Sequence, residues 1–152
     1  MSLHVTTAGK GPRLVMLHGW GLNSRVWDPI LPRLSERFTT VCIDLPGHGT
    51  SSWPPKFHDI DSLARLIEPY LESKGSNPSL SPCFLLGWSL GSMVALALAA
   101  KHTNSIRRLV IVAHTPKFVR SADWPHGTEE KVVDDFAVRV STEYRATIRE
   151  FL

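Results

Sequence analysis

Cysteine is scarce in this sequence, and long apolar runs are missing. Cys42 and Cys83 are the only cysteines among 152 residues, which is too few for a disulfide framework or a cysteine-based zinc site. Because each lies in a β-like segment, we expect two buried, reduced thiols. The longest unbroken apolar run, Met93 to Ala100, falls far short of the roughly 20 residues that a membrane helix needs. These absences argue against a disulfide-rich scaffold and against a membrane partner.

An excess of charge of one sign is also missing. The chain has 17 Lys and Arg against 14 Asp and Glu, a net charge of +3, and 43% of its residues are hydrophobic. This balance argues against a disordered chain and against a nucleic-acid partner. No apolar stretch follows a basic start at the N-terminus, so we expect no secretory signal and a cytoplasmic location.

Apolar runs and helical patterns alternate along most of the chain. Short apolar or β-branched runs predict strands at residues 14–17, 38–45, 83–86 and 106–112. Apolar residues at helical spacing predict helices at residues 26–38, at a segment capped by Asp59 or Asp61 that ends near Gly75, and at residues 89–101. In the first of these, Pro29 and Pro32 should confine the regular part to the region after them. The repeated strand–helix–strand order predicts an α/β fold, with a mainly parallel sheet and helices on both faces.

The pattern changes after Pro116. Residues 117–127 look irregular, and from Thr128 onward apolar residues recur at a strict four-residue step that predicts one amphipathic helix, at Val132, Phe136, Val140, Tyr144 and Ile148. No strand-like segment follows, so a sheet that ends on this charged helix looks unfinished. We therefore expect two parts, residues 1–116 with the sheet and residues 117–152 with the helix.

The sharpest motif is the G-x-S-x-G segment around Ser89, from Gly87 to Gly91. It lies between a predicted strand and a predicted helix, which is the context that a nucleophile elbow requires. In such an elbow, glycines flank the serine because side chains would collide at the sharp turn. The helix N-terminus then favours negative charge beside the hydroxyl. The alternative is a strand–helix junction used only for packing.

A second motif, HGWG from His18 to Gly21, follows the first apolar strand. Acyl transfer needs N–H donors directed at the oxyanion of the tetrahedral intermediate. Elbow enzymes take one from the residue after the serine, here Leu90, and another from a loop after an early strand. The Trp20 N–H is the candidate for that second donor, and the alternative is a turn with Trp20 packed in the core. His18 itself is expected to brace the loop.

Four segments together resemble the α/β-hydrolase superfamily: HGWGLNSRVW, DLPGHGTS, GWSLG and DWP. Within it, Trp20, Trp88 and the stretch Asp123 to Pro125 make the chain most similar to the family of pimeloyl-acyl-carrier-protein methyl ester esterases of biotin synthesis. The resemblance runs to Leu152. It implies an α/β-hydrolase fold whose core begins in residues 1–116 and whose helical lid begins in residues 117–152, without the later core strands.

The resemblance implies a role for each matching residue. Ser89 is the nucleophile, and Trp20 and Leu90 supply the oxyanion-hole N–H groups and contact the substrate together with Ser89. The segment similar to the substrate-contacting part of the lid comprises Tyr144, Arg145, Ala146, Thr147 and Ile148. Arg145 and Ala146 match by position alone, whereas the other three also match by residue type.

The family's partner is an acidic acyl-carrier protein, and the resemblance implies neither a metal nor an organic cofactor. Basic residues near the mouth of the pocket would bind such a partner, and the candidates are Arg139, Arg145 and Arg149. Glu143 and Glu150 lie among them, so a solvated helix face with i,i+4 pairs explains any one arginine equally well.

The acid and base of the superfamily are not found. They follow the serine along the chain, but only His102, His114 and His126 come after Ser89. Of these, His114 lies at the C-terminal edge of the predicted sheet, where sites form, and is the one substitute to consider. Its counterpart in the family is not a base. Asp44 resembles a loop-bracing aspartate of the family and not its triad acid.

Three functions therefore stay open. The first is a serine carboxylesterase that hydrolyses the methyl ester of a pimeloyl-carrier-protein type of substrate. The second is another α/β hydrolase, an esterase or a carbon–carbon bond hydrolase. The third is a non-catalytic fragment or half of a split protein, because the residues that would activate Ser89 are missing.

Overall fold

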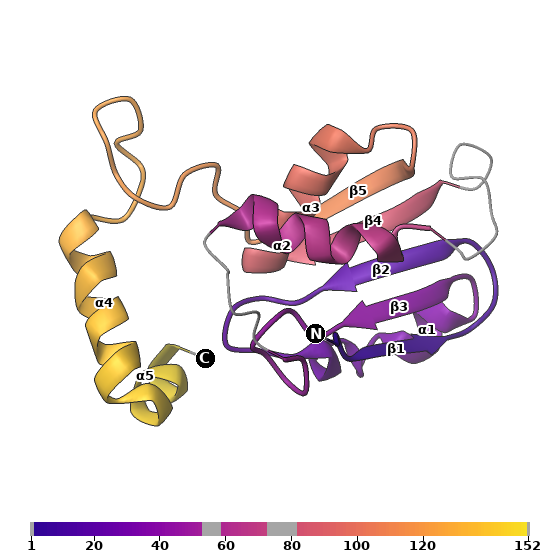
Figure 1. Ribbon diagram of the computed structural model, residues 1–152, viewed down its shortest axis with the longest axis horizontal. Coiled ribbons are helices and arrows are strands. Elements are labelled where there is room, and N and C mark those ends of the chain that lie inside the picture. The colour runs from indigo at the N-terminus through magenta and orange to yellow at the C-terminus, as the bar shows by residue number, and fades with distance from the viewer. Residues whose placement is uncertain (1, 53–58, 73–81, 152) are drawn as a thin grey trace. The chain divides into compact units, whose positions relative to one another are not determined.

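The computed structural model describes residues 2–52, 59–72 and 82–151 (Figure 1). The chain divides into two compact units, Met1–His114 and Thr115–Leu152. Each unit is described by itself. None of the described helices is both long and apolar enough to cross a membrane.

The first unit is built on a five-stranded sheet with the strand order β1-β3-β2-β4-β5. The strands are β1 (Val5–Ala8), β2 (Arg13–Leu17), β3 (Thr39–Ile43), β4 (Cys83–Trp88) and β5 (Ile106–Val112). β2, β3, β4 and β5 pair in parallel, whereas β1 pairs antiparallel with β3. The predicted parallel sheet is confirmed. β1 was not predicted from the sequence, because most of its residues are exposed and its apolar pattern is short.

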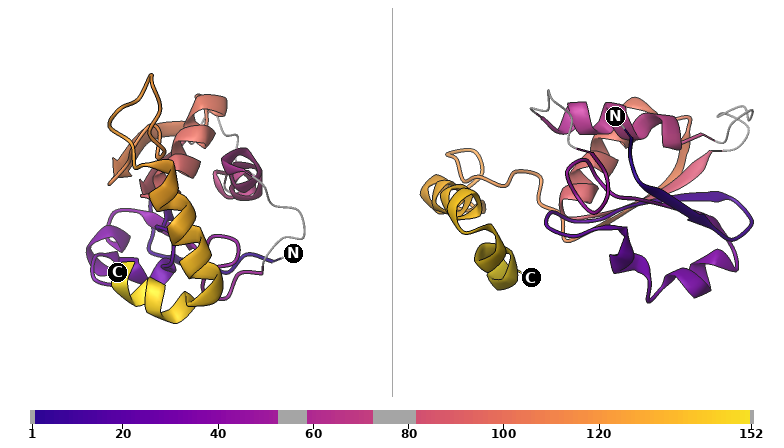
Figure 2. Two further views of the ribbon diagram at one scale, coloured as in Figure 1. Left: turned by 90° about the vertical axis from the view of Figure 1, so that its left-hand side faces the viewer. Right: turned by 60° about the horizontal axis from the view of Figure 1, so that its bottom comes forward.

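Helices cover both faces of this sheet, as Figure 2 shows in its right-hand view. α2 (Ile60–Ile67) and α3 (Leu90–Lys101) bury their apolar sides against one face, with a core that includes Val15, Val41 and Leu85. On the other face, the 3-10 helix η1 (Ser24–Trp27) and α1 (Leu31–Ser35) pack over a smaller core. The α/β prediction therefore holds for both layers of helices.

Prolines shorten two of the predicted helices. The helix expected over residues 26–38 is η1 followed by α1, because Pro29 and Pro32 lack the N–H that a continuous helix would need. α2 begins as one of the two options predicted, with the Asp59 carboxylate accepting from the Ser62 N–H at 2.7 Å. It gives way at Glu68 to the 3-10 helix η2 (Glu68–Tyr70), which contains Pro69. The expected end near Gly75 lies outside the described residues.

The outer edge of β5 is not paired with any described strand. Its C-terminal residues Val110, Ile111 and Val112 are 49%, 43% and 44% exposed. Successive strand residues point to opposite faces, so the apolar exposure affects both sides of this strand. β5 therefore ends the described sheet with apolar residues that are nearly half exposed.

Both cysteines are buried and free, as expected. Cys42 lies on β3 and Cys83 at the start of β4. Burial raises the pKa of each thiol to about 11. Thiols with such a pKa stay protonated at neutral pH and react slowly.

The second unit contains a loop and two helices, α4 (Glu130–Thr142) and α5 (Tyr144–Phe151). The single helix predicted from the four-residue step is wrong, because the chain leaves helical geometry at Glu143, at φ −134° and ψ 44°. The Ser141 and Thr142 hydroxyls both donate to the Val138 carbonyl, and such back-bonding competes with the helical hydrogen bonds.

Candidate active site

Ser89 occupies a sharp turn between a strand and a helix. β4 ends at Trp88 and α3 begins at Leu90, so Ser89 alone makes the turn. Its backbone has φ +52° and ψ −114°, a left-handed conformation that is unfavourable for a residue with a side chain. Strain of this kind persists where surrounding contacts hold it, and it gathers at functional sites. The geometry is the one predicted for a nucleophile elbow.

The two glycines of the motif leave room for the turn. A Cβ atom on Gly87 would lie 2.3 Å from the carbonyl oxygen of Gly91. One on Gly91 would lie 2.3 Å from the carbonyl oxygen of Leu17, at the end of β2. Both contacts are with backbone atoms, which cannot move aside cheaply. Any other residue at either position would push the elbow away from the sheet.

The HGWG loop lies directly beside the elbow. A Cβ atom on Gly19 would be 3.4 Å from the Cβ of Ser89 and 3.5 Å from the carbonyl oxygen of Trp88. The structure therefore brings together the two motifs that the sequence singled out. Trp20, the next residue, is half-buried, which fits an oxyanion-hole loop as well as a turn with Trp20 packed in the core.

The oxyanion-hole roles of Trp20 and Leu90 stay predictions that this arrangement permits. Leu90 is the first residue of α3, and the first N–H groups of a helix have no partner within the helix. The N-terminus of α3 also carries the positive end of the helix dipole. Both features suit an anion that forms next to Ser89.

His18 braces the loop, as expected. It is fully buried, its Nδ1 lies 2.7 Å from the Gly19 carbonyl, and its Nε2 accepts from the Leu45 N–H at 2.9 Å. Because a carbonyl oxygen can only accept, the proton is on Nδ1. Burial lowers the pKa of His18 to about 4. A neutral imidazole with both nitrogens occupied cannot serve as the catalytic base.

Asp44 braces a second loop. Its carboxylate accepts from the Ser24 N–H at 2.7 Å and from the Thr50 N–H at 3.0 Å. Burial alone would raise the pKa of this carboxyl, but the hydrogen bonds from Ser24 and Thr50 outweigh burial and lower it. A Cβ on Gly49 would lie 2.0 Å from Asp44 Oδ2, so glycine is needed there. Asp44 therefore has the structural role that its motif suggested.

His114 forms a hydrogen bond with Ser92 and not with Ser89. Its Nδ1 lies 3.1 Å from the Oγ of Ser92, one turn into α3. Within the described ranges, no imidazole or carboxylate makes a hydrogen bond to Ser89 Oγ. His102, at the end of α3, lies 3.4 Å from Glu68 through Nε2. The structure therefore gives no support to His114 as a substitute base.

The predicted lid residues lie on α5, in the second unit. Tyr144, Arg145 and Ala146 are exposed, Ile148 is half-buried, and Thr147 is buried. The Thr147 hydroxyl donates to the Glu143 carbonyl at 3.0 Å. This is a back-bond at the start of α5 to a carbonyl that also accepts from the Thr147 N–H, and it engages the hydroxyl proton. Substrate contact by these five residues remains a prediction.

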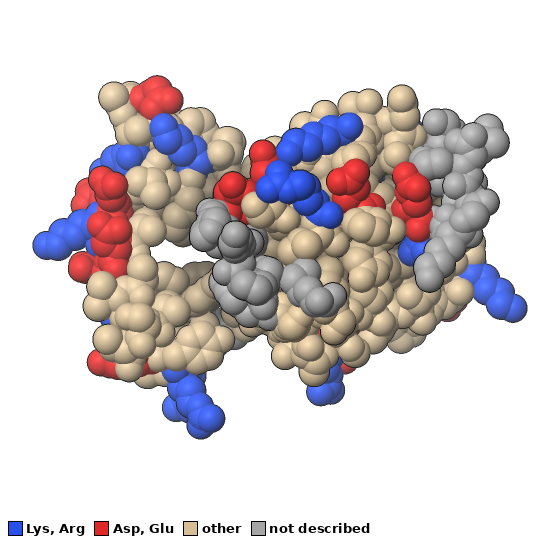
Figure 3. Space-filling view, viewed as in Figure 1, with Lys and Arg blue, Asp and Glu red and all other residues tan. Residues whose placement is uncertain are grey.

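The charges of the second unit are of both signs (Figure 3). Arg139 pairs with Glu150, and this hydrogen bond raises the pKa of Arg139. Arg120 pairs with Glu129 at 3.0 Å, and Lys117 with Asp123 at 2.9 Å. Of the three arginines considered for a carrier protein, Arg139 is therefore engaged with an acidic neighbour.

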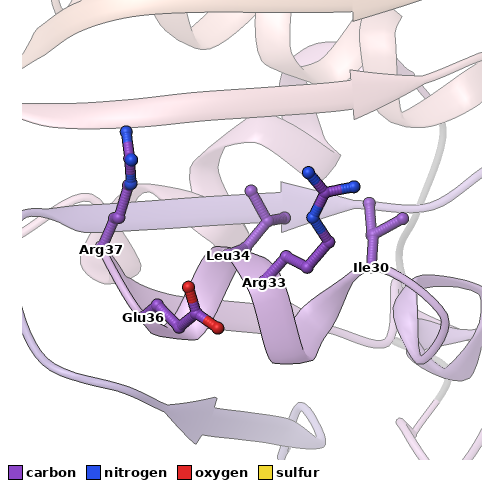
Figure 4. A pocket seen from close by; sticks show the side chains of 5 residues that line it. All are labelled: Ile30, Arg33, Leu34, Glu36 and Arg37. Atoms are coloured by element: carbon purple, nitrogen blue, oxygen red, sulfur yellow. The ribbon is translucent and has the colours of Figure 1, made fainter.

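A groove of about 530 Å³ runs along α1 (Figure 4). Its lining consists of Ile30, Arg33, Leu34, Glu36 and Arg37. None of these residues belongs to the elbow or to the HGWG loop, so the groove is separate from the candidate active site. In the described ranges, no group of three or more His, Cys, Asp or Glu side chains is placed to hold a metal ion.

Comparison with known proteins agrees with this geometry. Residues 12–147 match the family described as the alpha/beta hydrolase fold. The chain belongs to the α/β-hydrolase fold family. An esterase from Exiguobacterium antarcticum superimposes with a TM-score of 0.86 at 25% identity, covering 98% of this chain and 55% of that one. A second solved structure, that of E-2-(acetamidomethylene)succinate hydrolase, gives a TM-score of 0.69 at 28% identity, covering 92% of this chain and 47% of that one.

Several curated proteins that this chain resembles carry the name pimeloyl-[acyl-carrier protein] methyl ester esterase. The protein from Nitrosomonas europaea is 40% identical over 151 residues, covering 99% of this chain and 56% of that protein. The one from Chromobacterium violaceum is 37% identical over 152 residues, covering 100% and 56%. This α/β hydrolase thus spans a little over half the length of the curated relatives it matches.

Proposed function

We propose that this chain carries the nucleophile of a serine esterase that hydrolyses the methyl ester of a pimeloyl-acyl-carrier-protein type of substrate. The observation that carries the proposal is the strained turn at Ser89, with the HGWG loop against it. The relatives named for that reaction support the substrate class. In this proposal residues 1–116 belong to the hydrolase core and residues 117–152 begin a helical lid.

Each residue then has a defined part in the reaction. The Ser89 oxygen attacks the ester carbonyl carbon while its proton passes to a base, and the carbonyl oxygen becomes an oxyanion. The N–H groups of Trp20 and Leu90 donate to that oxyanion. When the intermediate collapses, the methoxy group takes a proton and leaves as methanol, and an acyl-enzyme ester remains on Ser89. Water then attacks this ester and releases the free acid.

The described residues leave the proton transfer without a base. A serine hydroxyl is a weak nucleophile until a base, itself held by a third group, takes its proton. An oxyanion hole and substrate binding alone give roughly 10³–10⁴-fold acceleration over water. We therefore expect the 152-residue polypeptide, assayed by itself, to turn over esters far below the ordinary range of about 1–10³ s⁻¹.

The lid residues and the carrier protein form the finer part of the proposal. Tyr144, Thr147 and Ile148 would contact the acyl chain, with Arg145 and Ala146 beside them. Arg145 and Arg149 remain the basic candidates for an acidic carrier, because Arg139 is paired with Glu150. In a fusion of this chain to the remaining segment of the Nitrosomonas europaea relative, charge reversal at Arg149 should raise KM for the carrier-bound ester and leave KM for a small ester unchanged.

Covalent labelling of Ser89 tests the proposal directly. The chain is joined to the remaining segment of the Nitrosomonas europaea relative, which supplies the rest of that protein's length, and exposed to a fluorophosphonate. We expect labelling and ester hydrolysis that are both lost in Ser89→Ala and retained in Ser141→Ala. Labelling that survives Ser89→Ala would show that Ser89 is not the nucleophile.

A broader esterase is the second candidate, and the similarity to the Exiguobacterium antarcticum esterase favours it. The same fusion, assayed with the pimeloyl-carrier-protein methyl ester and with short nitrophenyl esters, separates the two. A kcat/KM that is higher for the carrier-bound ester supports the methyl ester esterase. Trp20→Ala keeps the backbone N–H of residue 20 and removes the indole that is proposed to contact the substrate. We therefore expect it to lower ester turnover while it changes the free energy of unfolding little.

A further inference from the structure

Two strained residues are joined across neighbouring strands of the sheet. Ser89 follows β4 and Ala113 follows β5, and among the described non-glycine residues these two have positive φ angles, +52° and +50°. The Ser89 N–H donates at 2.9 Å to the carbonyl of Val112, the residue before Ala113. Such conformations persist only where neighbouring contacts hold them. The geometry of Ser89 therefore depends on the contacts that hold its backbone.

The carbonyl of Ser89 is held on the other side by the first turn of α3. It accepts from the N–H of Ser92 at 2.9 Å and from the N–H of Met93 at 3.2 Å. It also accepts from the Ser92 hydroxyl at 2.5 Å. Ser92 is fully buried, so bulk water cannot form a hydrogen bond with its hydroxyl. Both backbone groups of Ser89, N–H and C=O, are thus fixed.

The Ser92 hydroxyl has one proton, and the geometry decides where that proton lies. A carbonyl oxygen can only accept, so a 2.5 Å contact with the Ser89 carbonyl requires the Ser92 proton between them. Ser92 Oγ must then accept from its other neighbour, His114 Nδ1, at 3.1 Å. His114 therefore carries its proton on Nδ1, and its Nε2 is left with a lone pair when the ring is neutral.

We propose that Ser92 and His114 are positioning residues for the nucleophile. His114 Nδ1–H donates to Ser92 Oγ, and Ser92 O–H donates to the Ser89 carbonyl. This relay links the end of β5 to the elbow and holds Ser89 in its left-handed turn. The inference rests on the proposed function only in giving Ser89 its role, because the relay itself is a statement about protons and backbone geometry.

The tautomer of His114 is measured on the 152-residue chain with ¹⁵N-labelled imidazoles, at about pH 8, above the usual His pKa of about 6.5. Two other histidines serve as internal references. His18 must carry its proton on Nδ1, which faces the Gly19 carbonyl, whereas His102 directs Nε2 at Glu68. We expect the His114 signals to match those of His18, and to lose that match in Ser92→Ala.

Amide hydrogen exchange at Ser89 measures the positioning itself. Ser92→Ala should accelerate exchange of the Ser89 N–H at least about tenfold, which corresponds to the loss of one hydrogen bond of ordinary strength. The matched control is Ser141→Ala, which removes the same kind of i to i−3 hydroxyl–carbonyl bond in α4 and should leave Ser89 unchanged. His114→Leu should resemble Ser92→Ala. His114→Asn keeps an N–H donor near the Nδ1 position and should restore slow exchange.

The NMR and hydrogen-exchange results test the relay independently of the proposed esterase function. A His114 proton on Nε2 in the unmodified chain overturns the proposal, whether or not any variant folds. Unchanged Ser89 exchange in a folded Ser92→Ala variant also overturns it. An Nδ1–H signal with protected exchange in this chain, together with a fusion to the Nitrosomonas europaea segment that no fluorophosphonate labels, supports the relay and contradicts the proposed function.

Discussion

The two units of the chain differ in what they do with their apolar side chains. Every buried apolar residue among those described lies between Leu14 and Leu71 or between Cys83 and Leu98, all in the first unit. In the second unit the buried side chain is that of Thr147, while Val132, Val138 and Phe151 are exposed. The first unit thus has a core of its own, and the second depends on few contacts.

The contacts of the second unit are of a modest kind. Phe136 and Phe151 pack with ring centroids 5.5 Å apart, and Arg139 and Glu150 pair across the same two helices. Surface ion pairs and single aromatic contacts contribute little each. A destabilising substitution in the first unit should therefore unfold a cooperative structure, whereas one in the second unit should have local effects.

Two glycines offer the strongest test of this difference. Gly91→Ala places a Cβ 2.3 Å from the Leu17 carbonyl, and Gly127→Ala places one 2.5 Å from the Arg120 N. We expect Gly91→Ala to destabilise the first unit by about 3 kcal/mol or more, the upper range for overpacking. Gly127→Ala should leave the unfolding midpoint of the first unit unchanged in urea titrations followed by circular dichroism. Equal losses in the two variants would mean that the units unfold together.

The next largest difference between the units should be in the pH dependence of their stability. Because burial holds the pKa of His18 at about 4, the unfolded chain binds this proton near pH 6.5 and the folded chain does not. Stability therefore falls as the pH falls from about 6.5 to about 4, by about 3 kcal/mol in total, and this loss stops at lower pH.

Urea unfolding across that interval measures the loss, and His18→Gln, which keeps an acceptor for the Leu45 N–H, should flatten it. His126→Gln in the second unit is the control and should keep the full slope. A slope that persists in His18→Gln would assign the acid sensitivity to other groups.

A pair of identical substitutions tests the contrast in burial. Val94 on α3 is 0% exposed and Val132 on α4 is 54% exposed. We expect Val94→Ala to cost about 2 kcal/mol, from lost burial and a small cavity, and Val132→Ala to cost less than about 0.5 kcal/mol. Thermal and urea unfolding provide both values. A large loss at Val132 would show that this side chain is covered in solution.

The smallest effect is expected at the Arg139–Glu150 pair, whose side chains are half-exposed or more. Glu150→Gln should shift no unfolding midpoint beyond its error, because exposed pairs gain little and are screened by salt. The measurable change is the loss of α4–α5 contacts in an NMR spectrum at low salt. If the midpoint moves clearly, the second unit has a stronger core than its exposure suggests.

The sequence was enough to predict the sheet and the elbow, for a physical reason. Strands buried on both faces read as continuous apolar runs, and the G-x-S-x-G motif needs glycines that few other structures require. It was not enough for β1, whose exposed residues leave no such run. The break at Glu143 was also missed, because the four-residue apolar step continues through it; the consecutive Ser141 and Thr142 were the available signal.

The contact between Ser92 and His114 illustrates what pattern reasoning cannot reach. The two residues are 22 positions apart, and they meet only because β4 and β5 are neighbours in the sheet and Ala113 turns the chain. The strand-like run before His114 predicts its place at the C-terminal edge of the sheet correctly, since β5 ends at Val112. Its partner could not be read from spacing, since hydrogen bonds depend on side-chain direction at the ångström scale.

The open edge of β5 sets the conditions under which this chain can be handled in the laboratory. An unpaired strand edge offers N–H and C=O groups to the same edge of another copy, and the paired fraction rises with protein concentration. Arg107 and Arg108 at the start of the strand oppose such pairing by charge repulsion, which salt weakens, but Val110 to Val112 do not. We therefore expect dilute samples at low ionic strength to contain mostly single chains, and larger assemblies to form when the same sample is concentrated or given salt, as sedimentation velocity would measure.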